Sequence, residues 1–465
     1  METRIVKVKS KELGHFEQGG ERLGRWQVAS DPVATAELRE AAAYLRTNDT
    51  PVAFPTETVY GLGADATRSA AVKGIYAAKG RPSDNPLIIH VSDLTMLRRF
   101  LAPAPSDAPD AADPIPAIYK PLLERFWPGP LTILLPLPSP SPLAPEVTAG
   151  LPTFAVRMPS SPLALSLIAL ADTPLAGPSA NASTKPSPTA ARHVLDDLAG
   201  RIELILDAGP CDVGVESTVV DGLCHPPVVL RPGGVALDRL RACPGWARAV
   251  KAYRDASEEG AAAPRAPGMK YKHYSPKATV VLYEAGGASG ADGVAAEDLQ
   301  RALDLPVAGG GPEGPAAGGG AEGPAAGGGA EGPVAGGGAE GLAAGGRKIG
   351  VIRTRRWKSV GAVGNRYRSV PAVAAEAVKE EASDETVFEI VEGELQGADG
   401  EALATILDID LGETIPGIAK GLFSALRELD RRGVGMIFVD GVEDGDDIAA
   451  AVMNRLRKAA SETRV

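Results

Sequence analysis

The sequence predicts an α/β protein of two domains, and three observations lead to this prediction. At 465 residues the chain is longer than one ordinary domain. Short apolar runs typical of strands alternate with helical patterns before residue 252, and a second alternating series begins at 278. Between them lies a stretch that starts with small, charged and proline residues, as linkers do. We expect a first domain at 1–252, a linker at 253–277 and a second domain at 278–465.

The first domain is expected to contain a twisted mixed sheet. Val72, Ile75 and Tyr76 share one face of a helix predicted at 69–80. Internal prolines indicate irregular strand ends rather than a regular doubly wound repeat. Strands are predicted at 51–54, 86–91, 131–137, 153–159, 202–208, 217–222 and 227–233, with further helices at 161–171 and 187–200.

The second domain is expected to be smaller, with a parallel sheet and Rossmann-like layers. Apolar residues recur at helical spacing through 414–432, and again near 446–460. No glycine-rich phosphate loop occurs at a strand–helix junction in this part of the sequence, so we interpret the second domain as a lid or docking domain. Strands are predicted at 278–284, 348–354, 387–393 and 435–442, and a third helix near 295–304.

A glycine-rich insertion interrupts the second domain at 309–346. It contains four tandem nine-residue units of the type GGGAEGPAA over 309–344. The units lack the aspartate of calcium-binding repeats, and glycine does not keep the period of collagen. With no large side chain to bury, the segment is predicted to be flexible, and we assign it no function.

Composition excludes several classes of protein. The chain has 48 basic and 59 acidic residues and a net charge of −11, which argues against a large nucleic-acid groove. Three cysteines and five histidines are scattered without a metal-ligand spacing, so no metal site is expected. The N-terminal residues contain no apolar signal region, and no apolar run reaches membrane-spanning length. We therefore expect a cytoplasmic protein with no membrane partner.

Residues 55–66, PTETVYGLGADA, contain a G-x-G-x-x-A spacing at Gly61, Gly63 and Ala66 that is typical of dinucleotide-binding loops. In those loops a strand leads directly into the first glycine and a helix begins at the last. Here Pro55 ends the predicted strand, and the six residues PTETVY precede Gly61. We interpret the glycines as part of a tight turn. The loop before them is expected to hold a small polar ligand, or else to stabilise the domain as a polar turn.

Other segments combine cations with small polar residues. Lys79 and Arg81 flank a glycine at a predicted helix end, where they suit either the helix dipole or a polyphosphate. The turn GPSANASTK, at 177–185, lets backbone N–H groups approach an anion. Glu216, Ser217 and Arg231 lie at predicted strand edges, where α/β proteins collect ligands. PGMKYKHYSP, at 267–276, has more cations and aromatics than a spacer needs, which indicates contact with a ligand.

In this order, the motifs resemble those of the YrdC-like threonylcarbamoyl-AMP synthases in their long, two-domain form. The resemblance is dense over 30–285 and looser over 345–460, and the repeat at 309–344 departs from it. Each motif is weak alone, but their common order is specific. The matching segments are PTETVYGLGADA, KGR with DNPLIIH, FWPGPLT, AVRMP, SAN, GVESTVV, LRPGG, the linker PGMKYKHYSP, LRELDRRG and AVMNRLRKA.

The resemblance implies a catalytic first domain and the synthesis of L-threonylcarbamoyl-AMP and pyrophosphate from L-threonine, bicarbonate or CO2, and ATP with Mg²⁺. The product would pass to the machinery that modifies tRNA beside the anticodon, without a stable nucleic-acid complex. The linker would fold over the pocket and the second domain would steady it. The implied catalytic residues, which neutralise charge, are Lys79 and Arg81. The implied threonine-binding residues are Thr56, His90, Arg157 and Ser217, and the implied ATP-binding residues are Lys79, Ser83, Thr132, Ser179, Asn181, Arg231 and Tyr274.

Three alternatives stay open at this point. A non-catalytic RNA-binding module is disfavoured by the net charge of −11. A carbamoyl-transfer maturation factor would be expected to carry zinc-binding cysteine pairs, which this sequence lacks. A nicotinamide oxidoreductase is disfavoured by the context of the glycine spacing at 61–66.

Overall fold

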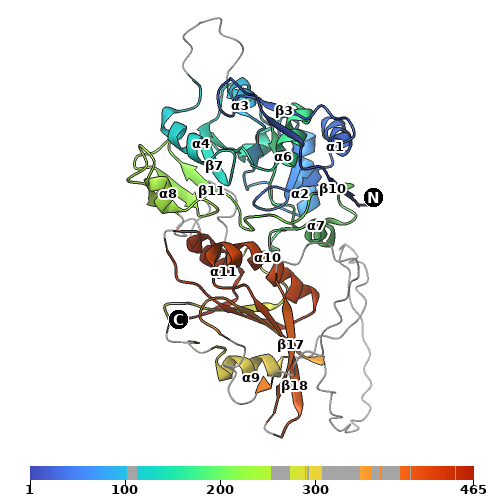
Figure 1. Ribbon diagram of the computed structural model, residues 1–465, viewed down its shortest axis with the longest axis vertical. Helices are drawn as coiled ribbons and strands as arrows, with labels where there is room; N and C mark the ends of the chain where they lie inside the picture. The colour runs from blue at the N-terminus through green and yellow to red at the C-terminus, as the bar shows by residue number, and fades with distance from the viewer. Residues whose placement is uncertain are drawn as a thin grey trace, which may run out of the picture.

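The computed structural model describes residues 1–101, 113–252, 273–287, 290, 293–305, 346–358, 367–368, 388–397, 399–445 and 447–465. Most of the expected linker, at 253–272, and the insertion at 309–345 lie outside the described residues. The predicted α/β class is confirmed, with two sheets and helices packed on them (Figure 1).

The first sheet is mixed and has eleven strands in the order β1-β10-β4-β5-β9-β6-β8-β7-β11-β12-β13. It contains parallel pairs, such as β6 with β8, and antiparallel pairs, such as β7 with β8. A separate two-stranded ribbon joins β2 (Gly14–Phe16) to β3 (Trp26–Val28). The sheet strands are β1 (Arg4–Lys7), β4 (Val52–Phe54), β5 (Gly61–Asp65), β6 (Ile88–His90), β7 (Leu131–Pro136), β8 (Thr153–Arg157), β9 (Leu175–Ala176), β10 (Leu204–Asp207), β11 (Thr218–Asp221), β12 (Val228–Arg231) and β13 (Val250–Lys251).

Helices α2 and α6 have recognisable end signals, whereas α7 (Ala191–Leu198) is shorter than the helix predicted at 187–200. Ser161 is the N-cap of α6: its hydroxyl accepts the Ala164 N–H, and Pro162 begins the first turn. Helix α2 ends at Gly80, whose φ of 60° is left-handed. The helices are α1 (Ala36–Thr47), α2 (Ser69–Lys79), α3 (Leu94–Leu101), α4 (Lys120–Phe126), α5 (Pro145–Thr148), α6 (Pro162–Ala171), α7 (Ala191–Leu198) and α8 (Leu237–Arg241), with a 3-10 turn η1 (Ala117–Tyr119).

The interpretation of the glycines at 61–66 as a tight turn was wrong. Gly61 and Gly63 lie in β5, which pairs antiparallel with β4. A Cβ at Gly63 would lie 2.6 Å from Cε1 of Phe54, so glycine is needed for the close approach of that ring. PTETVY is therefore the connection between two antiparallel strands. The dinucleotide alternative fails, since no helix follows the glycines directly.

The second sheet has seven strands in the order β16-β17-β18-β15-β19-β14-β20. Five neighbouring strands, β18-β15-β19-β14-β20, are parallel, as predicted. In contrast, β17 pairs antiparallel with β18, and β18 lies where the sequence pattern predicted no strand. The strands are β14 (Thr279–Tyr283), β15 (Lys348–Arg353), β16 (Tyr367–Arg368), β17 (Ile390–Gln396), β18 (Ala402–Asp410), β19 (Met436–Asp440) and β20 (Glu462–Arg464). The helices are α9 (Ala296–Asp304), α10 (Ile415–Arg431) and α11 (Ala449–Ala459).

Helices α10 and α11 lie between the second sheet and the first domain (Figure 1). One apolar cluster joins Val59 and Val215 of the first domain to α10 residues such as Ile418 and Leu422. A polar contact follows at Thr189, whose Oγ1 lies 2.8 Å from Oγ of Ser424. The second domain therefore docks directly against the loops that follow β4 and precede β11.

None of the helices in the described ranges is both long enough and apolar enough to span a bilayer.

Candidate active site

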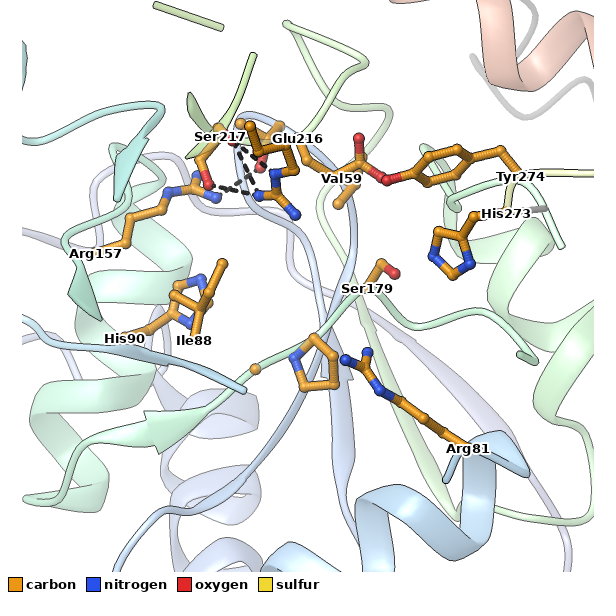
Figure 2. Close-up of a pocket in the computed structure, with 14 residues that line it drawn as sticks. Val59, Arg81, Ile88, His90, Arg157, Ser179, Glu216, Ser217, His273 and Tyr274 are labelled. Carbon is orange, nitrogen blue, oxygen red and sulfur yellow. Dashed lines mark hydrogen bonds between the residues drawn. The ribbon is translucent and has the colours of Figure 1, made fainter. Parts of the chain in front are cut away.

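A cavity opens where several strand ends of the first sheet meet the chain segment that enters the second domain (Figure 2). His90 ends β6, Arg157 ends β8 and Arg231 ends β12, so the sheet register brings their side chains together. The residues that line the cavity are Thr58, Val59, Arg81, Ile88, His90, Arg157, Gly177, Pro178, Ser179, Glu216, Ser217, Arg231, His273 and Tyr274.

One side of the cavity carries His90, Arg157 and Ser217 (Figure 2). His90 and Arg157 are register partners on the parallel pair β6 and β8. Burial, and next to it the charge of Arg157, lower the pKa of His90 to about 3, so its ring is neutral at physiological pH. Its Nδ1 is buried and has no hydrogen-bond partner in the part of the chain that the structure describes. This nitrogen is available to a ligand.

Arg157 is buried, and residues of the loop 55–60 neutralise and orient it. Its Nη2 donates to Oε1 of Glu57 at 2.5 Å and its Nη1 donates to Oγ1 of Thr58 at 2.8 Å. Its Nε donates to the carbonyl of Gly129 at 3.3 Å. A buried guanidinium with so many partners is held in one orientation, which suits the positioning of a small ligand.

Thr56 stabilises this loop from within rather than lining the cavity. Its hydroxyl accepts the N–H groups of Thr58 and Val59 and donates to the Val59 carbonyl at 2.7 Å. This is the geometry of a short hydroxyl-capped turn, which uses up the hydrogen-bonding capacity of Thr56 locally. The threonine that faces the cavity is Thr58.

The opposite side carries Arg81, Ser179, His273 and Tyr274 (Figure 2). The left-handed Gly80 turns the chain at the end of α2, which places Arg81 at the cavity. Burial lowers the pKa of Arg81 to about 10, so the guanidinium stays charged. Its Nη2 donates to the Pro86 carbonyl at 3.3 Å, whereas its buried Nε has no partner among the described residues. Arg81 thus brings an unused donor to this side.

Lys79 supports the wall behind Ser179. Its Nζ donates to the carbonyl oxygens of Ser179 and Asn181, the latter at 2.7 Å, and to Oδ1 of Asn181 at 3.4 Å. Burial lowers the pKa of Lys79 well below its usual value. Asn181 also accepts the Ser179 hydroxyl at 2.5 Å. Lys79 and Asn181 therefore shape the loop 179–181 without lining the cavity.

Ser217, Thr132 and Arg231 form a buried cluster. Oγ of Ser217 lies 2.8 Å from Oγ1 of Thr132 and 3.1 Å from Nη2 of Arg231. Arg231 also donates to the Ser217 carbonyl, from Nη2 at 2.9 Å and from Nε at 3.2 Å. Thr132 is buried and does not line the cavity, so its contact with the lining is through the Ser217 hydroxyl.

Tyr274 reaches the cavity from the segment that enters the second domain. Its φ of 69° is left-handed, a backbone conformation that is uncommon for an aromatic residue. Such strained conformations occur most often at functional sites. Its ring packs against His273, with centroids 4.4 Å apart, and against Phe423 of α10 at 5.2 Å. Burial raises its pKa to about 12, so the hydroxyl remains a donor. Helix α10 therefore helps to hold an unfavourable backbone conformation that covers the cavity.

The structure brings most of the predicted site residues together. Those in the lining are Arg81, His90, Arg157, Ser179, Ser217, Arg231 and Tyr274. Lys79, Thr56, Thr132 and Asn181 lie behind the lining, and Ser83 lies in an exposed turn. The other lining residues, to which no binding role was assigned, are Thr58, Val59, Ile88, Gly177, Pro178, Glu216 and His273. Of these, Glu216 was expected at a strand edge that collects ligands, and His273 in a segment expected to contact a ligand. The density of polar residues in PTETVY and KYKHY was the signal that could have identified Thr58 and His273.

Within the described ranges, no group of three or more His, Cys, Asp or Glu side chains is placed to hold a metal ion. Glu216 is the one acidic residue among the described residues of the cavity lining, and its two oxygens already contact Ser187 and Arg455. The residues of the cavity do not fit a metal site built by the protein.

Comparisons with known proteins agree with this geometry. The family model described as "Telomere recombination" matches 45–233, and the model described as "Threonylcarbamoyl-AMP synthase, C-terminal domain" matches 235–461. A threonylcarbamoyl-AMP synthase of Schizosaccharomyces pombe is 40% identical over 99% of this chain and 98% of its own. The chain belongs to the threonylcarbamoyl-AMP synthase family.

Other members of the threonylcarbamoyl-AMP synthase family show the same relationship. The Bacillus subtilis enzyme is 50% identical over 56% of this chain and 71% of its own. The structure of Pyrococcus abyssi Sua5 with L-threonine matches with a TM-score of 0.63 and 32% identity over 99% of both chains. A variant of that archaeal protein, with a histidine and the following tyrosine replaced by alanine, gives the same TM-score over 99% of this chain and 98% of its own. The two-domain form is thus shared with a family member that binds L-threonine.

Proposed function

We propose that the cavity binds L-threonine on the side of His90, Arg157 and Ser217, and ATP on the side of Arg81. The chain synthesises L-threonylcarbamoyl-AMP, the activity of its curated relatives. One observation carries the assignment of the two sides. Nδ1 of His90 and Nε of Arg81 are buried without a partner among the described residues, and they belong to opposite sides of one cavity.

The threonine side matches the chemistry of a small hydroxy amino acid. Arg157 supplies a fixed cation for the carboxylate, while Glu57 keeps the local charge balanced. The unpartnered nitrogen of His90 suits the threonine hydroxyl, and the Ser217 hydroxyl is a further polar contact. Thr56 contributes by holding the loop that presents Thr58, so it acts through that turn.

The ATP side supplies positive charge and small residues. Arg81 and Arg231 face the phosphates in this proposal, and Ser179 allows close approach of the chain. Lys79 and Asn181 contribute by fixing the loop 179–181, and Thr132 contributes through Ser217. Contact of Ser83 with ATP stays a prediction.

The reaction needs positioning more than a reactive side chain. The threonine amine adds to bicarbonate or CO2 to give a carbamate, with loss of water when bicarbonate is used. A carbamate oxygen then attacks the α-phosphorus, and pyrophosphate leaves. Arg81 and Arg231 neutralise the charge that develops on the phosphates. Burial raises the pKa of the Cys211 thiol, so the cysteine nearest to this region is not activated as a nucleophile.

His273 and Tyr274 close the ATP side. This sequence contains one His–Tyr dipeptide, at 273–274, and the archaeal variant described above lost such a pair. Closure excludes water, which protects the carbamate from hydrolysis. We propose Mg²⁺ as part of the ATP substrate, held by the phosphate oxygens, and transfer of the product to the tRNA-modifying machinery. A cytoplasmic location stays a prediction that cell fractionation would test.

The first experiment follows pyrophosphate. Purified full-length protein with ATP, Mg²⁺ and bicarbonate is expected to release pyrophosphate only when L-threonine is added, with an equal amount of a threonine-containing AMP adduct detected by mass spectrometry. L-valine, which replaces the hydroxyl by a methyl group of similar size, is the matched control and should give much less product. Pyrophosphate release without an adduct, or equal rates with both amino acids, would contradict the proposal.

A further inference from the structure

Arg455 of α11 is a fully buried cation that reaches from the second domain to the cavity wall. Its Nε donates to Oε2 of Glu216 at 2.9 Å, and its Nη1 donates to the Pro232 carbonyl at 2.6 Å. Its guanidinium carbon lies 5.8 Å from the ring centroid of Tyr274. The exposed fraction of Arg455 is 0%, so these contacts form only when the domains are docked.

Glu216 is the charged partner of Arg455, and it lies in the cavity lining. Among the described residues that line the cavity, it alone supplies a carboxylate, and its other oxygen accepts the Ser187 hydroxyl at 2.5 Å. Burial by itself raises the pKa of Glu216, but the charges of Arg455 and Arg231 lower it to about 2. Glu216 is therefore an anion inside a cavity that must accept ATP, which is also an anion.

Stability alone does not account for Arg455. Its Nη2 is buried without a hydrogen-bond partner among the described residues. Buried ion pairs with incomplete partners contribute little to folding compared with apolar residues of similar size. The position would be filled better by an aliphatic side chain if packing were its sole role, so its charge is the property to explain.

We propose that Arg455 is a positioning residue that neutralises Glu216, so that Arg231 and Arg81 attract ATP only when the second domain is docked. Without Arg455, Glu216 repels the phosphates and competes for Arg231. The inference rests on the proposed function, because it assumes that ATP occupies this cavity. The other titratable groups whose charge acts on Glu216 or is affected by it are Arg231, Lys79, His273 and Tyr274.

The test compares the ATP and L-threonine kinetics of full-length variants. Arg455→Met is expected to raise the KM for ATP roughly 10- to 100-fold, with a smaller effect on the KM for L-threonine. Arg457→Met is the matched control, because Arg457 lies in the same helix and pairs with Glu284 and Asp444 instead. The control should keep the KM for ATP of the unmodified protein.

Two readouts separate charge neutralisation from a merely structural role. Glu216→Gln in the Arg455→Met background is expected to recover most of the lost ATP affinity, because it removes the uncompensated charge. In Arg455→Met alone, the pKa of Glu216 rises when its nearest cation is lost. The KM penalty should therefore shrink as the pH is lowered from 8 to 6, since protonation of Glu216 removes the repulsion.

Arg455→Lys keeps the charge and provides the comparison if Arg455→Met fails to fold, as judged by circular dichroism. Its KM for ATP is expected to stay within roughly threefold of the unmodified value, because the remaining loss is one of geometry. A double variant as impaired as Arg455→Met, or a lysine variant as impaired as the methionine variant, would overturn the inference. An unmodified protein without threonine-dependent pyrophosphate release would instead overturn the proposed function.

Discussion

At the scale of single residues, the space around His90 is set by a glycine. A Cβ at Gly177 would lie 2.8 Å from Nδ1 and 3.0 Å from Cε1 of His90. Gly177 also donates its N–H to the Ile88 carbonyl at 2.9 Å, so its backbone cannot move away without losing that bond. The absence of a side chain at 177 therefore keeps the unpartnered nitrogen of His90 open to a ligand.

Gly177→Ala tests the role of His90 without removing it. The new methyl group must displace the imidazole, and small displacements of positioning groups are costly to binding and rate. We expect the KM for L-threonine to rise roughly tenfold while the KM for ATP changes less than threefold. Steady-state pyrophosphate release checks this. Gly20→Ala is the control, since nothing lies within 4 Å of a Cβ there; equal effects on both substrates would argue against the assignment of the two sides.

At the scale of elements, α10 fixes how the second domain meets the site. Gly214 has a φ of 77°, and its Cβ would lie 2.4 Å from Cα of Lys420 in α10. Nearby, Nη2 of Arg427 pairs with Oδ2 of Asp197 at 2.7 Å. The helix thus lies directly against the backbone of the loop that leads to Glu216 and Ser217.

Gly214→Ala should push α10 away from the first domain. We expect a loss of roughly 2–5 kcal/mol in the free energy of unfolding, because backbone strain and a clash act together. Urea denaturation followed by tryptophan fluorescence measures the loss, and small-angle X-ray scattering should show a larger radius of gyration.

Gly209→Ala, compared with Gly214→Ala, separates the effect of backbone strain from the effect of the clash with α10. Gly209 has a φ of 92° but nothing within 4 Å of its Cβ, so it carries the backbone strain alone. It should cost about 1–2 kcal/mol and leave the radius of gyration unchanged. If both variants behave alike, the close approach of α10 is not what requires glycine at 214.

At the scale of the whole molecule, three histidines are kept uncharged by the fold. Burial is the main cause, and the neighbouring cations Arg157, Arg427 and Arg81 act in the same direction, so the pKa values of His90, His193 and His273 fall to about 3. In the unfolded chain a histidine takes up its proton near pH 6.5. Between pH 6.5 and 3 the unfolded state therefore binds more protons than the folded state, and stability falls as the pH falls.

Acid should weaken the fold well before carboxylates are protonated. Each fully buried neutral histidine lowers the free energy of unfolding by about 1.4 kcal/mol per pH unit below its unfolded pKa. His90 alone should give this slope, and His193 and His273 should make it steeper. Below pH 4.5, the ordinary pKa of a glutamate, protonation of Glu216 in the unfolded chain should lower the stability further. Urea midpoints between pH 7.5 and 5 measure the dependence. His193→Gln should reduce the slope, and a stability independent of pH over this range would contradict the prediction.

Much of the fold follows from local patterns. The helices at 69–79, 162–171 and 415–431 lie where apolar periodicity and end signals predicted them, and the central strands lie where apolar runs did. The strand at 61–65 was misinterpreted, because its two glycines resemble a turn and gain their strand role from the ring of Phe54. The two-residue strand β9 could not be found, since its pairing with β5 and β6 defines it.

The sequence by itself determined the order of motifs, and with it the family, the reaction and the group of residues around the site. Only the tertiary structure decided which of those residues line the cavity. The Thr56 hydroxyl is hydrogen-bonded within its own turn, and the Lys79 amine donates to carbonyl oxygens of another loop. Neither residue lines the cavity. Arg455 meets Glu216 across a separation of 239 residues, and that contact exists because two domains dock. Side-chain chemistry is local, but whether a polar group is already satisfied depends on neighbours that only the folded chain supplies.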